Sequence, residues 1–184
     1  MPALTAATWV CAALLTLAGA RKMTRPDATG AALQVAHLPA DLRLVRTLGA
    51  VEVGTGVWVL AAGGPVATAL LALLYAAFAG FAEHQRRRGA GCGCFGAEQA
   101  PATALHVGVN VVAAVVAGST LLGDPAAALP GTVAAAPLAG VLMLTLLAVA
   151  SALLRLLLAE APDLAAAVAR LRPERSRRPQ IAKR

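Results

Sequence analysis

Two cysteines one residue apart, Cys92 and Cys94, are the side chains of this sequence best suited to chemistry. Gly91, Gly93 and Gly96 surround them and allow the unusual backbone angles that a small ring needs. Cα atoms two residues apart lie about 5.5–7 Å from each other, which overlaps the roughly 4.4–6.8 Å range of disulfides. A disulfide in so small a ring is strained and easily reduced, so the pair suits thiol–disulfide exchange.

Three arginines, Arg86, Arg87 and Arg88, precede the cysteine pair, and their positive charge favours the reactive thiolate form. Two other interpretations of the pair remain open. In the first interpretation the thiols are unreactive members of a tight turn, and in the second they bind a metal. Because two thiols are too few for a closed zinc site, a metal would need His84 or His106 as a further ligand.

Polar side chains within the apolar segments form a second group of candidates. Glu52 is the clearest, because an ionisable side chain inside a membrane span is costly and is a functional candidate by default. The alternative is a carboxyl group that only hydrogen-bonds to a neighbouring helix. His106 and Asn110 are four residues apart and share a helix face. Lys22 ends the first apolar segment, and we expect all these side chains at the same end of the bundle as the thiols.

The composition indicates that lipid surrounds most of the chain. Of its 184 residues, 59% are hydrophobic and 14% are charged, whereas soluble domains have about 45–50% and 25%. The net charge is +7, but aromatic residues make up only 3%, and the basic residues avoid the apolar segments. We therefore expect a membrane protein with no nucleic-acid partner. Three cysteines cannot form a disulfide framework.

Five apolar segments are long enough to cross a bilayer as helices. We predict an all-α integral membrane protein in which residues 1–158 form a helical bundle, with a four-span core plus one further span. The predicted spans are approximately residues 4–20, 44–62, 65–82, 101–122 and 132–158. The first resembles a signal peptide, but no positive charge precedes it, so we interpret it as a retained helix.

The connecting segments carry turn signals and charge. Residues 21–46 are polar and are predicted to hold a short amphipathic helix around residues 31–38, whereas residues 63–65 form a tight turn. Residues 159–184 are predicted to be a basic tail with a short surface helix followed by a disordered arm.

The distribution of basic residues predicts the orientation of the chain. With the N-terminus outside, the inside segments are residues 21–46, residues 83–100 and the C-terminal tail. Together with Arg155 at the inner end of the last span, they contain all sixteen lysines and arginines. The positive-inside rule therefore places the Cys-x-Cys loop and the tail in the cytoplasm.

Across most of residues 4–122 the sequence resembles the MauE family, within the wider DoxX-like group of membrane proteins. The similarity is carried by residues 18–22 (AGARK), residues 48–54 (LGAVEVG) and the motif Cys92-Gly93-Cys94-Phe95-Gly96. Asn110 falls where the family tends to have an Arg-Asn pair, but Val109 stands in place of the arginine.

The resemblance implies a DoxX-like helical bundle in the bacterial plasma membrane and a link to methylamine utilisation. The family is associated with maturing methylamine dehydrogenase, a disulfide-rich enzyme, and thiol–disulfide transfer with a thioredoxin-like partner is the implied role. That enzyme matures outside the cytoplasm, whereas the charge pattern places the cysteine loop inside, and we retain the predicted topology.

These observations lead to a redox hypothesis, in which Cys92 and Cys94 cycle between dithiol and disulfide while Glu52 and His106 handle protons. A quinone or a thioredoxin-like protein exchanges the electrons, and no bound metal is required. The supporting residues are Lys22, Arg88, Phe95, Gly96 and Asn110. Two alternatives are a non-enzymatic accessory protein that anchors a partner, and a small metal or solute handler that uses the same side chains.

Overall fold

The computed structural model describes residues 2–91, 93, 101–123, 126–135, 138, 140, 141, 145, 148, 149 and 151–153. Within them the protein is all helical, as predicted. The helices in chain order are α1 (Pro2–Thr24), α2 (Asp27–Val35), α3 (Leu42–Ala61), α4 (Pro65–Arg87), α5 (Ala104–Leu122) and α6 (Leu129–Ala135).

Four of these helices are long and apolar enough to cross a membrane. They are α1 from Ala3 onward, α3, α4 and α5, with 19 to 23 residues each and a mean hydropathy of 1.4 to 1.9. At about 1.5 Å per residue, such helices match the ~30 Å hydrocarbon core of a bilayer. Large apolar side chains face outward from the bundle, including Leu73, Val112 and Leu122 at 66%, 62% and 91% exposure. A multi-pass helical membrane protein is therefore confirmed.

The spanning helices extend past the predicted apolar segments where polar side chains find partners. α1 continues from residue 20 to Thr24, and α4 continues from residue 82 to Arg87. Lys22 near the end of α1 is buried, and the arginines at the end of α4 pair with Glu83 one turn earlier. The helical backbone thus runs beyond the hydrophobic stretch that hydropathy detects.

The predicted fifth span, residues 132–158, is described only in part. α6 ends at Ala135, and the described residues between 138 and 153 are helical. Gly140 and Ser151 are buried among them. A fifth crossing and an outside N-terminus stay predictions, and Arg155 and the tail of residues 159–184 lie outside the described residues.

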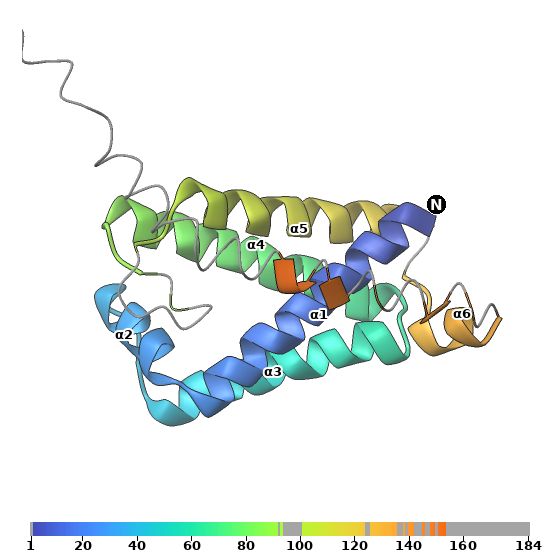
Figure 1. Ribbon diagram of the computed structural model, residues 1–184. Helices are drawn as coiled ribbons and strands as arrows, with labels where there is room; N and C mark the ends of the chain where they lie inside the picture. The colour runs from blue at the N-terminus through green and yellow to red at the C-terminus, as the bar shows by residue number, and fades with distance from the viewer. Residues whose placement is uncertain are drawn as a thin grey trace, which may run out of the picture.

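The spanning helices are arranged as two antiparallel pairs, α1 with α3 and α4 with α5 (Figure 1). The C-terminal ends of α1 and α4, the start of α5 and the short helix α2 lie together at one end of the bundle. The turn between α3 and α4 lies at the opposite end. The first end is the one to which the sequence assigned the candidate residues.

Helix α2 begins four residues before the predicted amphipathic helix, at Asp27 rather than residue 31. Pro26 directly before it suits a helix start, and the negative charge of Asp27 in the first turn interacts favourably with the positive end of the helix dipole. The helix ends at Val35, after which His37 adopts a left-handed conformation with φ of 57°.

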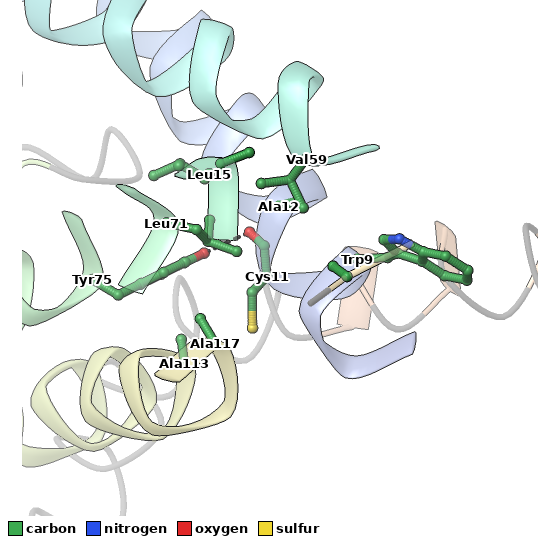
Figure 2. Packing of buried hydrophobic residues seen from close by; sticks show 11 residues of the cluster. Trp9, Cys11, Ala12, Leu15, Val59, Leu71, Tyr75, Ala113 and Ala117 are labelled. Carbon is green, nitrogen blue, oxygen red and sulfur yellow. Dashed lines mark hydrogen bonds between the residues drawn. The ribbon is translucent and has the colours of Figure 1, made fainter. Parts of the chain in front are cut away.

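The apolar core gathers large residues from α1, α3 and α4 against alanines of α5 (Figure 2). Leu15, Val59 and Leu71 are at most 1% exposed. The small side chains of Ala113 and Ala117 let α5 pack closely on this cluster.

At the end opposite α2, the turn between α3 and α4 is closed by backbone contacts. Gly63 and Gly64 have φ values of 63° and 92°, so the predicted tight turn is present. The Gly64 N–H donates a 2.9 Å hydrogen bond to the Ala126 carbonyl, and the Trp9 indole donates one of 3.0 Å to the Ala127 carbonyl. The segment after α5 is thereby fixed to both α1 and this turn.

The contact between α1 and α3 generates a prediction about Gly56. A Cβ there would clash with the Thr16 hydroxyl and lie 2.6 Å from the Ala12 carbonyl oxygen. We expect Gly56→Ala to destabilise the protein by about 1–3 kcal/mol, as overpacking does. Gly54→Ala is the matched control, because that position of the same helix has open space. Equal thermal unfolding midpoints of the two variants in detergent would contradict the close packing.

Candidate functional site

A buried ion pair joins α1 to α3 near the α2 end of the bundle. The Lys22 ammonium donates a 2.8 Å hydrogen bond to Glu52 Oε2, and the two side chains are 3% and 0% exposed. The sequence placed both residues at one end, and the structure brings them into direct contact. Each charge is tolerated within the hydrocarbon because the other neutralises it.

A close backbone contact positions this ion pair. A Cβ on Gly19 would lie 2.5 Å from the Gly49 carbonyl oxygen, and one on Gly49 would lie 2.7 Å from the Gly19 oxygen. Lys22 and Glu52 each follow one of these glycines by three residues, which puts them on the same helix faces as the contact. The two glycines therefore determine the separation of the charged side chains.

A third helix contributes an aromatic ring to the pair. The Lys22 ammonium lies 5.3 Å from the centre of the Phe78 ring of α4, within the range of a cation–π contact. Glu52 Oε1 is buried and has no hydrogen-bond partner among the described residues. The carboxylate thus keeps one oxygen that can accept a proton or a hydrogen bond.

Of residues 91–96, the structure describes only Gly91 and Gly93, because Cys92, Cys94, Phe95 and Gly96 lie outside the described residues. Gly93 has a φ of 66°, the unusual angle expected for this loop. Its carbonyl oxygen accepts a 3.0 Å hydrogen bond from the Thr29 hydroxyl of α2. The Gly91 carbonyl oxygen accepts one of 3.0 Å from the Gln85 side chain.

Sequence reasoning missed both Thr29 and Gln85. Gln85 lies in the polar run EHQRRR, which is typical of a solvated helix end, yet the side chain is fully buried. Thr29 lies in a segment interpreted mainly as a connection and is 4% exposed. The amphipathic pattern predicted a helix only around residues 31–38, and Pro26 and Asp27, which are typical of a helix start, are the signal that it begins before Thr29.

The three arginines before the cysteines have protein partners. Arg86 makes two hydrogen bonds to the Glu83 carboxylate, of 2.6 and 2.9 Å, and Arg87 makes one of 2.7 Å. Arg88 donates a 2.8 Å hydrogen bond to the Val35 carbonyl at the end of α2. Glu83 therefore offsets part of the positive charge that the sequence suggested for the thiols.

His106 and Asn110 lie on one face of α5, as predicted, but their hydrogen bonds are local. His106 Nδ1 lies 3.0 Å from the Thr103 hydroxyl and accepts a 3.3 Å hydrogen bond from the Thr103 N–H, which caps the helix. Asn110 donates a 2.7 Å hydrogen bond to the His106 carbonyl. Since Nδ1 accepts the bond from a backbone N–H, the proton of a neutral ring is on Nε2.

The candidate residues therefore fall into separate groups. Lys22 and Glu52 form an ion pair, and Asn110 is hydrogen-bonded to the His106 carbonyl. Arg88 is hydrogen-bonded to the last residue of α2. In the described part of the chain, no hydrogen bond joins the α5 residues to the ion pair. No cluster of three or more histidine, cysteine, aspartate or glutamate side chains occurs within that same part.

One comparison with known proteins gives a match. The family model described as methylamine utilisation protein MauE matches residues 1–123, which include α1 to α5 and the cysteine motif. No curated protein and no solved structure matches the chain.

The ion pair generates a prediction about stability. We expect Lys22→Met or Glu52→Gln alone to destabilise the protein by about 3–5 kcal/mol, because each leaves an uncompensated buried charge. The double variant removes both charges and should lose clearly less than the sum. Unfolding in detergent measures all three variants, with Arg87→Met in the exposed Glu83–Arg87 pair as a control that changes little. Additive losses would show that the two charges are not coupled.

Proposed function

Because the chain belongs to the MauE family of membrane proteins, we propose that it supports thiol–disulfide exchange at the bacterial plasma membrane. In this proposal Cys92 and Cys94 exchange electrons on behalf of a partner enzyme and promote its maturation. The family description points to methylamine utilisation, and methylamine dehydrogenase is the client that fits this description.

The proposed reaction balances as a two-electron exchange. Oxidation of the Cys92–Cys94 dithiol releases two protons and two electrons and forms one sulfur–sulfur bond. The acceptor is a quinone, which becomes a quinol, or the disulfide of a thioredoxin-like protein, which becomes a dithiol. In the reverse direction the Cys92–Cys94 disulfide oxidises a client dithiol through a mixed disulfide, in which one client thiolate attacks one of the two sulfurs.

The observation that carries the proposal is the Lys22–Glu52 pair with its unpartnered oxygen. Ionisable groups inside a membrane are typical of proton pathways, because burying them brings no benefit to stability by itself. Glu52 Oε1 is a buried acceptor, and Glu52 pairs with Lys22 in the last turn of α1. The end of α1 lies at the end of the bundle where α4 ends and α5 begins (Figure 1). We assign to Glu52 the uptake of protons that thiol oxidation releases, with Lys22 balancing the carboxylate charge.

His106 takes a narrower part in this proposal than the sequence suggested. Its Nδ1 atom caps α5 through Thr103, so proton transfer by the ring has to use Nε2. Phe95, Gly96 and Asn110 remain supporting residues in the proposal, with Asn110 held on the His106 carbonyl.

We also place the thiol pair on the cytoplasmic side, from the distribution of basic residues. In this arrangement a thioredoxin-like partner reaches the loop from the cytoplasm, while a quinone reaches it from the bilayer. The basic tail then lies on the same side, against anionic lipid.

The redox proposal predicts that both oxidation states occur in living cells. Acid quenching followed by thiol trapping and mass spectrometry should find Cys92 and Cys94 partly as a disulfide. Cys92→Ser and Cys94→Ser should each impair oxidation of the client, and Cys11→Ser, which changes the buried third cysteine, should not. Thiols that stay reduced under all growth conditions, with unaffected clients, would refute the proposal. If deleting residues 172–184 has the larger effect, the accessory-anchor alternative is favoured.

The predicted sidedness is tested by labelling in intact cells. A membrane-impermeant maleimide should not label Cys92 or Cys94, whereas a permeant maleimide should label both. Ala62→Cys, in the exposed turn between α3 and α4, provides the outside reference and should react with the impermeant reagent. Labelling of Cys92 and Cys94 by the impermeant reagent would reverse the proposed orientation.

A further inference from the structure

We infer that α2 is the positioning element of the Cys-x-Cys loop, and that Thr29 and Gln85 are its positioning residues. The inference rests on the proposed function, because Thr29 and Gln85 would regulate the reactivity of the same Cys92–Cys94 pair. It is supported by contacts of the described residues that neither the sequence pattern nor the family description contains.

Gln85 is the central link between α2 and the loop. Its side-chain amide nitrogen donates hydrogen bonds of 2.9 Å to the Ala32 carbonyl of α2 and 3.0 Å to the Gly91 carbonyl of the loop. Because both partners are carbonyl oxygens, only the NH₂ group of the amide fits this position, which settles the orientation of the side chain. The Gln85 side chain is fully buried, and its amide hydrogens are needed to join the two backbone segments.

A second link holds the glycine between the two cysteines. Thr29 donates to the Gly93 carbonyl, and a Cβ on Gly93 would lie 2.6 Å from the Ala28 carbonyl oxygen. Gly93 also has a positive φ of 66°. Both the backbone angle and the lack of space therefore require glycine, and Gly93 lies directly on the backbone of α2.

A third link closes the arrangement at the far end of α2. Arg88 donates to the carbonyl of Val35, the last residue of the helix, and thereby satisfies one of its open carbonyl groups. On the other side of the cysteines, the Ala102 N–H donates a 2.8 Å hydrogen bond to the Ala90 carbonyl. The α2 residues that make these contacts are spaced as one helix face: Ala28, Thr29, Ala32 and Val35.

The contacts have a consequence for the thiols. Gly91 and Gly93 are covalently bonded to Cys92, and Gly93 also to Cys94, so each cysteine is attached to backbone that α2 holds. A disulfide between residues this close needs a preformed turn, and fixing that turn lowers the entropy that ring closure loses. The contacts with α2 should therefore stabilise the disulfide and slow the reaction of the free thiols with small alkylating reagents.

The test compares conservative pairs of variants in the purified full-length protein. Thr29→Val removes the hydroxyl donor at nearly constant volume, and Thr29→Ser retains it. Gln85→Leu removes the two hydrogen bonds that the side-chain amide donates. Thr47→Val is the matched control, because Thr47 hydrogen-bonds to the Arg43 carbonyl within α3 and away from the loop.

Two measurements are made on each variant: the disulfide equilibrium in glutathione buffers, and the iodoacetamide alkylation rate of the reduced thiols. Thr29→Val and Gln85→Leu should each lower the disulfide equilibrium constant and raise the alkylation rate about two- to tenfold, the effect of losing one net hydrogen bond. Thr29→Ser and Thr47→Val should match the unmodified protein.

The inference is overturned if Thr29→Val behaves like Thr47→Val in both measurements. Should Gln85→Leu fail to fold, the comparison of Thr29→Val with Thr29→Ser still decides the question, because both substitutions change the side-chain volume little. Alkylation does not depend on any cellular redox partner. A positive result here with thiols that never oxidise in cells would therefore reject the proposed function alone.

Discussion

The burial of one ion pair in hydrocarbon is the constraint on which the arrangement of the helices depends. Lys22 and Glu52 are both charged residues within candidate membrane spans, and neither is tolerated there without the other. Their contact requires α1 and α3 to approach closely, which Gly19 and Gly49 permit because neither carries a Cβ. Phe78 then brings α4 to the same pair. A local requirement for charge neutralisation is thus met by contacts between three helices.

Polar groups elsewhere in the bundle follow the same physical rule. Without water in the bilayer, hydroxyl groups must find partners within the protein. The Thr8 and Thr120 hydroxyls lie 2.9 Å apart across α1 and α5, and the Tyr75 hydroxyl donates a 2.7 Å hydrogen bond to the Cys11 carbonyl (Figure 2). The buried side-chain atoms that lack a hydrogen-bond partner among the described residues are Glu52 Oε1, Gln85 Oε1 and Ser151 Oγ, and Glu52 Oε1 is the acceptor to which the proposed function assigns protons.

The short helix α2 links the two parts of the proposed site. It lies in the connection between α1, which carries Lys22, and α3, which carries Glu52. Its Thr29 hydroxyl donates to the Gly93 carbonyl, and Gln85 of α4 donates both to its Ala32 carbonyl and to the Gly91 carbonyl. The residues that position the loop and the residues that form the ion pair therefore belong to one continuous stretch of chain plus the end of α4. This arrangement explains why a connecting segment adopts an ordered helix here.

The sequence by itself determined the class of fold, four of the spans, the tight turn at Gly63 and Gly64, and the family. Hydropathy, turn propensity and short motifs are properties of neighbouring residues, so they can be read without knowing how helices face one another. Only the tertiary structure decided that Lys22 contacts Glu52, which is thirty residues away, and that Gln85 is buried between α2 and the loop. Those contacts depend on how far each helix rotates about its axis and how closely its glycines let a neighbour approach, and neither quantity is contained in any local stretch of sequence.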